Sequence, residues 1–162
     1  MKPGPRYAAS LELLRASETL WNAGRVFLER WNLSPSQFNV LNLLFGEEEG
    51  CTQTELSREL LMHRSNVTGL VDRLEARGLA RRKDSLTDRR VFNVVITDAG
   101  TALMRQIYPH YYRAAEALWG EMPVERAAEL ASEIATISSN AGRIAAKANP
   151  ERPKGTADSD QA

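Results

Sequence analysis

Apolar positions between residues 52 and 97 change period along the chain, and this change predicts two short helices followed by a β-hairpin. Thr52 and Glu55 stand three residues apart, which is the spacing of a capping box, so the first helix should begin near Thr52. In the second helix, spacings of three and four residues create one apolar stripe that should pack against the domain, made of Val67, Leu70, Val71 and Leu74.

The end of the second helix and the hairpin are marked by their residue types. Gly78 stands where a glycine commonly ends a helix, and residues 79–83 lead into a strand. Residues 91–97 are rich in β-branched and aromatic side chains. They should form the returning strand and close a hairpin around Ser85 to Asp88.

The outward face of the second helix carries short polar residues. It bears Ser65, Gly69 and Asp72, flanked by Arg64, Asn66, Thr68 and Arg73. Such side chains reach base edges and phosphates when the N-terminus of a helix lies in a major groove, and a glycine adds no bulk there. A helix of this kind beside a basic hairpin is typical of proteins that read double-stranded DNA.

Two helices are predicted before this segment. Residues 7–31 carry two apolar rows, which is more apolar surface than one small neighbour needs. The first row is Leu11, Leu14, Trp21 and Leu28, and the second is Leu13, Leu20, Phe27 and Trp31. Ser34, Pro35 and Gln37 then open the next helix as N-cap, first-turn proline and capping partner.

Two further helices are predicted after the hairpin. Thr97 should cap a helix that runs towards Trp119 and kinks at Pro109, which lacks a backbone donor. Pro123 should start the last helix, whose apolar seam should pack on another helix. That seam is Ala127, Leu130, Ile134, Ile137, Ala141 and Ile144. The tail from residue 149 to 162 has no apolar period and is expected to be disordered.

Composition limits these predictions to one core. A chain of 162 residues with 43% hydrophobic content is long enough for a single domain and short for two. The formal net charge is zero, but residues 77–90 hold six basic and two acidic residues, a local charge of +4. Residues 98–162 hold seven basic and nine acidic residues. Positive charge is therefore concentrated where a DNA backbone would pass.

A longer motif connects these features to a known family. The run LxxxLxxxxSNVTxLVDRLExRGLxRR, followed by TDRRxxxVxIT and then by Asp98, Ala99 and Gly100, resembles the winged helix-turn-helix of the MarR family of bacterial transcription regulators. The resemblance is specific between Leu56 and Gly100. It implies a homodimer that binds a short palindromic operator, probes the major groove with this helix and the minor groove with the wing, and often releases DNA on binding a small phenolic or acidic ligand.

The fold expected is mainly α-helical with a small β-hairpin wing. Residues 34–97 would form the winged helix-turn-helix, and residues 1–33 and 98–148 a helical dimerisation region. The resemblance places these residues at the DNA: Arg64, Ser65, Asn66, Thr68, Gly69, Arg73, Arg82, Lys83, Arg89 and Arg90. Of Arg89 and Arg90, one would lie in the minor groove and the other would be held by a nearby acid such as Asp72 or Asp88, which would orient the wing.

The second apolar row of residues 7–31 and the seam of the last helix predict a dimer held by the first and last helices. The dimer interface would include Leu11, Leu14, Leu130, Ile134, Ile137 and Ile144. An effector pocket between the dimer helices and the winged domain could be lined by Trp21 and Phe38, although core packing explains these two aromatic residues equally well. The sequence does not say whether the protein represses or activates transcription.

Other classes of function find less support. A winged helix can also serve as a protein-interaction scaffold, but the Asp-Arg-Arg wing tip and the local charge favour DNA. The chain has no Gly-rich phosphate loop, no nucleophile elbow and no His-Glu-x-x-His pair, so we expect no enzyme activity and no cofactor. His63 and His110 lack a ligand set at metal spacing and should be surface or structural residues.

Cys51 and the N-terminus complete these expectations. The single cysteine excludes an intrachain disulfide, and Glu47, Glu48 and Glu49 beside it should raise the pKa of its thiol, which disfavours a redox sensor. The first apolar run is interrupted by charged residues, and no stretch approaches the ~20 apolar residues of a membrane span. We expect a cytoplasmic protein.

Overall fold

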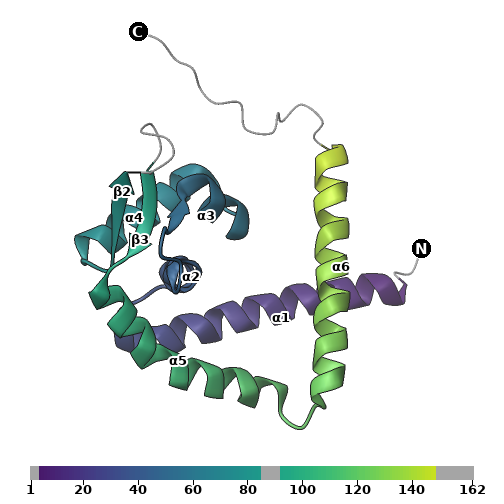
Figure 1. Ribbon diagram of the computed structural model, residues 1–162. Helices are drawn as coiled ribbons and strands as arrows, with labels where there is room; N and C mark the ends of the chain where they lie inside the picture. The colour runs from purple at the N-terminus through teal and green to yellow at the C-terminus, as the bar shows by residue number, and fades with distance from the viewer. Residues whose placement is uncertain (1–3, 85–91, 149–162) are drawn as a thin grey trace. The chain divides into compact units, whose positions relative to one another are not determined.

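The computed structural model describes residues 4–84 and 92–148 (Figure 1). Its elements are α1 (Pro5–Leu28), the 3-10 turn η1 (Glu29–Trp31), α2 (Pro35–Leu44), β1 (Cys51–Thr52), α3 (Gln53–Glu59), α4 (Arg64–Ala76), β2 (Ala80–Asp84), β3 (Phe92–Ile96), α5 (Asp98–Trp119) and α6 (Val124–Ala148). The chain forms two compact units that divide within α5, after His110. The mainly α-helical fold with a small β-hairpin is confirmed.

Two capping boxes fix the starts of α2 and α3, as the sequence predicts. The Gln37 amide N–H donates to Ser34 Oγ at 3.2 Å, and the Ser34 N–H donates to Gln37 Oε1 at 2.9 Å. Thr52 and Glu55 make the equivalent pair at 3.1 and 2.8 Å. The bonds from Thr52 also lower the pKa of the Glu55 carboxyl, because they favour its charged form.

Helix α4 buries its predicted apolar stripe and ends at the predicted glycine. All four stripe residues, Val67, Leu70, Val71 and Leu74, are buried. Gly78 has a φ of +68°, and the Leu79 N–H donates to the Leu74 carbonyl at 3.0 Å. This is the Schellman arrangement, in which glycine adopts the left-handed conformation without steric cost. The chain then turns directly into β2.

The hairpin pairs β2 with β3, and a third strand completes the sheet. Pairing runs antiparallel from Ala80 opposite Ile96 to Asp84 opposite Phe92, so the strands differ from the predicted ranges by one residue at their ends. The expected turn around residues 85–88 lies outside the described residues. Strand β1 was not predicted, because two residues are too few to show a period; it pairs with β3 and makes the order β1-β3-β2.

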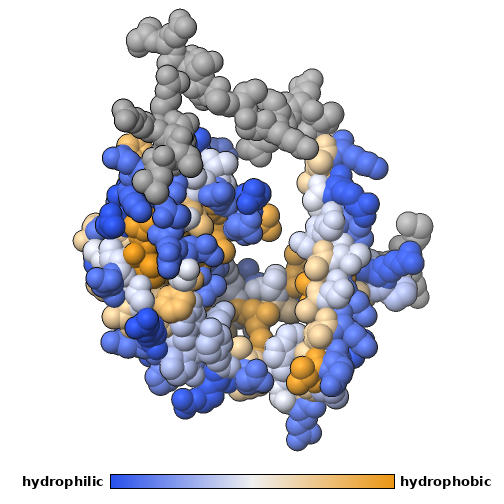
Figure 2. Space-filling model, viewed as in Figure 1, coloured by the Kyte–Doolittle hydropathy of each residue, from blue (hydrophilic) through white to orange (hydrophobic). Residues whose placement is uncertain are grey.

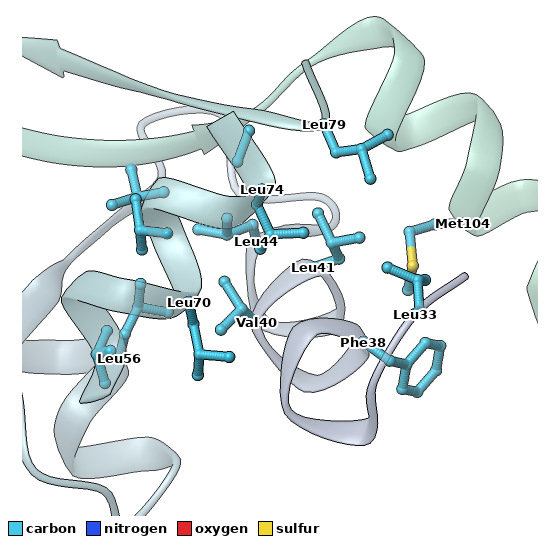
Figure 3. Close-up of a cluster of buried hydrophobic side chains, with 14 of the residues drawn as sticks. Leu33, Phe38, Val40, Leu41, Leu44, Leu56, Leu70, Leu74, Leu79 and Met104 are labelled. Atoms are coloured by element: carbon cyan, nitrogen blue, oxygen red, sulfur yellow. The ribbon is translucent and has the colours of Figure 1, made fainter. Parts of the chain in front are cut away.

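The core lies between α2, α3, α4 and the sheet (Figure 3). Leu44 of α2, Leu56 of α3 and Leu74 of α4 are fully buried there. Leu28 at the end of α1 and Met104 near the start of α5 belong to the same cluster. The ends of the flanking helices are therefore part of the winged-helix core, and this core extends beyond the expected boundaries of residues 34–97.

The helices after the sheet follow the predictions closely. Thr97 Oγ1 accepts from the Gly100 N–H at 3.1 Å and caps α5, which contains Pro109 and ends at Trp119. The kink expected at Pro109 stays a prediction. Helix α6 begins at Val124, one residue later than expected, because the Pro123 carbonyl accepts the Ala127 N–H at 3.0 Å and Pro123 acts as the residue before the helix.

Gly100→Ala should destabilise the fold by about 1–3 kcal/mol, the usual range for overpacking a close contact. A Cβ atom at Gly100 would lie 2.2 Å from the Leu79 carbonyl oxygen and 2.7 Å from Ile96 Cγ1, so α5 would have to move away from the sheet. Urea unfolding measures the loss. Gly142→Ala in α6 is the control: nothing lies within 4 Å of its added Cβ, and it should be neutral or stabilising. Equal stabilities would contradict the packing described.

Candidate nucleic-acid interface

The N-terminal turn of α4 presents the candidate DNA-reading side chains to solvent. Arg64, Ser65 and Asn66 are its first three residues, and all are exposed. Within residues 4–84 and 92–148, no hydrogen bond or ion pair engages the side chain of Arg64 or Asn66. Toward the described residues, these two side chains keep their full hydrogen-bonding capacity.

His63 caps this helix, a role that the sequence did not reveal. Its Nδ1 accepts from the Ser65 N–H at 3.4 Å and lies 2.9 Å from Ser65 Oγ. Histidine is not among the residues that usually cap a helix, so only the position before α4 could have suggested the role. The contact fixes the orientation of Ser65 at the exposed N-terminus of α4.

Thr68 is tied into a polar network that joins α3, α4 and β2. Its hydroxyl donates to the Arg64 carbonyl at 3.1 Å and lies 2.8 Å from the side-chain amide of Gln53. With the amide nitrogen of Gln53 donating to Thr68, its oxygen accepts from Nε and Nη2 of Arg82, both at 3.3 Å. Thr68 is half-buried and already bonded, so it is less available to a base than Asn66.

Arg82, which was expected at the DNA, pairs with carboxylates of α4, and its contact with DNA stays a prediction. Its Nη2 lies 2.7 Å from Asp72 Oδ1, and its Nη1 pairs with Glu75. The Arg82 backbone N–H also donates to Glu75 Oε1 at 2.7 Å. Because Arg82 and Glu75 are half-buried, solvent screens the attraction between their charges less than it would at the surface. Asp72 and Glu75 lie three residues apart on one helix face, a spacing that could have predicted a basic partner.

The pair between Asp72 and Arg82 connects α4 to a wing strand. Asp72 was expected to orient the wing through Arg89 or Arg90; the partner observed is Arg82 on β2. The other expected orienting residue, Asp88, lies outside the described residues together with Arg89 and Arg90.

The other cations on or beside the expected interface differ in whether they have an acidic partner. Lys83 Nζ lies 3.7 Å from Glu49 Oε2, and the Glu49 carbonyl accepts from Asn93 Nδ2 at 2.9 Å. Arg73 on α4 and Arg81 on β2 are exposed, and neither has a partner in the part of the chain that the structure describes. Together with Arg64, they leave three unpaired positive charges on the helix and strand expected to meet DNA.

Helix α6 exposes the apolar seam expected at a dimer interface. None of its described residues is buried, and Ile134, Ile137 and Ile144 are 37%, 49% and 69% exposed. Figure 2 shows apolar surface along α6 beside charged surface. Leu130 is half-buried. Exposed apolar stripes of this kind are typical of contacts with other protein surfaces, and the dimer interface expected on α6 stays a prediction.

Helix α1 also exposes part of its apolar rows. Leu14 and Trp21 are exposed and Leu11 is half-buried, whereas Leu28 belongs to the core. Phe38 is only 2% exposed and packs in the same core. Of the two alternatives given for Phe38, core packing describes its place in the structure, and its part in an effector pocket stays a prediction.

The surroundings of Cys51 disfavour a reactive thiolate. Burial raises the pKa of the Cys51 thiol, and the carboxylates of Glu55, Glu47 and Glu59 raise it further. Of the three acidic neighbours expected to do so, Glu47 is confirmed.

Among the described residues, no three His, Cys, Asp or Glu side chains are placed to hold a metal ion. In the same part of the chain, no helix is long and apolar enough to cross a membrane.

The chain is similar to known proteins in the part that contains α4 and the sheet. Residues 31–91 match the MarR family. The chain is 32% identical over 99 residues to the HTH-type transcriptional regulator MhqR of Bacillus subtilis, which covers 61% of this chain and 68% of that protein. It is 30% identical over 107 residues to the transcriptional repressor MprA of Escherichia coli K12, covering 65% of this chain and 60% of MprA. The curated relatives are thus matched over about two thirds of their length.

Solved structures match over nearly their full length. The transcriptional repressor CouR bound to a 23-mer DNA duplex is 31% identical, with a TM-score of 0.71, and the match covers 85% of this chain and 98% of that chain. AbsC, a MarR family transcriptional regulator from Streptomyces coelicolor, has a TM-score of 0.77 at 22% identity, covering 86% and 96% of the two chains. The second likeness is one of fold.

Proposed function

Because this chain belongs to the MarR family of winged helix-turn-helix transcriptional regulators, we propose that it controls transcription by occupying a palindromic DNA operator as a homodimer. The observation that carries the proposal is the unpaired polar face at the N-terminus of α4. Arg64 and Asn66 are exposed, and their side chains have no partner among the described residues. A major groove offers them base edges and phosphates.

The network around Arg82 supports the same function. It holds β2 against α4 through Asp72 and Glu75, so the helix and this strand would meet DNA as one surface. Arg81 and Lys83 flank Arg82 on the strand and would contact the DNA backbone. Arg89 and Arg90, at the expected wing tip, would serve the minor groove; this role rests on the family resemblance.

A homodimer fits both the operator and the exposed surface of the chain. A palindrome presents two identical half-sites, which a two-fold symmetric dimer matches. The seam of α6, with Ile134 and Ile137 exposed, supplies apolar surface for a second copy, and α1 would contribute Leu11 and Leu14. We place these residues in the dimer interface.

Release by a small aromatic or acidic ligand completes the proposal. A second solved structure under the name CouR, from Rhodococcus jostii RHA1 and bound to p-coumaroyl-CoA, is 24% identical to this chain. Of the two aromatic residues expected at an effector pocket, Trp21 and Phe38, only Trp21 is exposed, so Trp21 would contact an effector of this chain.

Sequence selection tests the function directly. Purified protein would select from a random duplex pool, and the enriched sequences would be footprinted. We expect an inverted repeat with half-sites about one helical turn apart, as dimeric helix-turn-helix proteins require. Binding without any enriched sequence, or no binding at low salt, would favour the alternative of a protein-interaction scaffold.

Asn66→Ala should cost about 1–3 kcal/mol at the operator, the usual value of a bidentate base contact, and should relax preference at particular base pairs. Asn66 is exposed and unbonded among the described residues, so the change removes nothing from the fold. Titrations compare the operator with random duplex. Asn22→Ala in α1, whose side chain bonds to Glu18, is the matched control and should change neither. Equal losses on both duplexes for Asn66→Ala would refute base reading.

A further inference from the structure

A hollow of about 340 Å³ lies beside α4, on the side that faces α2. Ser36 of α2 and Met62 of the turn between α3 and α4 line it. Helix α4 contributes Ser65, Gly69 and Arg73. The hollow thus borders the candidate DNA-reading face but includes a residue of α2, which the sequence did not connect with DNA.

The polar groups of this hollow suit an anion. Arg73 brings a guanidinium without an ion pair, and Ser36 brings a half-buried hydroxyl without a hydrogen bond, within the described part of the chain. No carboxylate lines the hollow. In contrast, the guanidiniums of Arg77 and Arg82 are bonded within the protein. The unpaired cation and hydroxyl therefore meet at one open site that lacks a negative charge.

Gly69 keeps this site open although the fold does not require a glycine there. It lies inside α4, where glycine disfavours the helix relative to alanine. An added Cβ would meet only the guanidinium nitrogens of Arg73, at 3.6 and 4.0 Å, which are ordinary contact distances. Packing inside the chain thus leaves room for alanine. The missing side chain instead lets a molecule outside the chain approach the helix closely.

We propose that this hollow seats one backbone phosphate of the operator, bonded by the Arg73 guanidinium and the Ser36 hydroxyl. The proposal rests on the proposed function and adds α2 to the DNA interface. A DNA strand is the occupant favoured by position, because the hollow is continuous with the exposed Ser65 and Asn66 of α4. A phosphate held between α2 and α4 carries no sequence information; it sets how deeply α4 enters the major groove.

The test combines protein variants with single uncharged methylphosphonate linkages along the operator. On the unmodified duplex, we expect Arg73→Gln to weaken binding about tenfold and Ser36→Ala about threefold, and Arg73→Gln to reduce the salt slope by about one. One linkage in each half-site should weaken wild-type binding. On that duplex, the two variants should cause no further loss, which is the signature of a direct pair in a double-mutant cycle. Arg105→Gln, an exposed arginine on α5, is the control for the change of charge.

Gly69→Ala adds a second readout that a structural role would not give. It should raise the stability of the protein to urea while weakening operator binding about tenfold, because the methyl group occupies the approach of the strand. A variant that gains stability and keeps full affinity overturns the proposal. So does a Ser36→Ala penalty that stays the same on every modified duplex.

Inorganic phosphate distinguishes a DNA strand from a free anion. At constant ionic strength, phosphate should not compete with the operator more strongly for wild type than for the Arg73→Gln variant. Specific competition would assign the hollow to a free phosphate and overturn the proposal. Absence of sequence-specific binding by the wild type would instead refute the proposed function itself, so the two failures are distinguishable.

Discussion

The double substitution Ile134→Glu and Ile137→Glu should convert the dimer into a monomer and weaken operator binding by about 100-fold or more. Both side chains lie on the exposed seam of α6, and glutamates there would bury unpaired charges between two copies. The loss at the operator follows from multivalency, since linking two modest half-site contacts raises affinity by about 10²–10⁴. Sedimentation at micromolar concentration and operator titration measure the two effects.

The control for this prediction adds the same charge to the opposite face of α6. Ser132→Glu with Ser139→Glu places two glutamates on residues about half a turn away from Ile134 and Ile137, so the dimer and operator affinity should persist. Circular dichroism must show unchanged helix content in both double variants. A dimer that survives glutamate at Ile134 and Ile137 would show that another surface holds the copies together.

The local fold could be predicted from the sequence because its signals act over a few residues. Capping residues such as Ser34 and Thr52, the apolar stripe of α4 and the left-handed Gly78 each determine their own element. Strand β1 could not be predicted, because it forms by pairing Cys51 with the distant Val94 and two residues show no periodicity. The contribution of Met104 to the core could not be predicted for the same reason, since it depends on tertiary packing.

The candidate site was less predictable, because its chemistry depends on which charges find partners. The sequence reading places Arg73 and Arg82 alike at the DNA and counts Arg81 only in the local charge. The structure separates them: Arg82 is bonded to Asp72 and Glu75, whereas Arg73 and Arg81 have no partner in the described residues. Ser36 lines the hollow because the fold brings α2 beside α4, which the sequence could not indicate. Spatial neighbours of this kind leave no spacing pattern in the chain.

Two adjacent arginines on β2 provide the sharpest test of this separation. Arg82→Met should lower the free energy of unfolding by about 1–2 kcal/mol, because Glu75 and Asp72 lose their cation. It should also reduce operator affinity about tenfold or more, since the wing strand would no longer be held against α4. Random DNA should be affected much less, because the Arg82 guanidinium is already paired with Asp72 and Glu75.

Arg81→Met is the matched control, because successive residues of a strand point to opposite faces and Arg81 is exposed. It should leave the free energy of unfolding within about 0.5 kcal/mol of wild type, as for most surface substitutions. Its effect on operator and random DNA should be similar, with a salt slope reduced by about one, as expected when one phosphate contact is lost. Urea unfolding and titrations at several salt concentrations compare the two variants. If Arg82→Met gave the same profile as Arg81→Met, Arg82 would be a phosphate ligand after all, and its pairs with α4 would break when DNA binds.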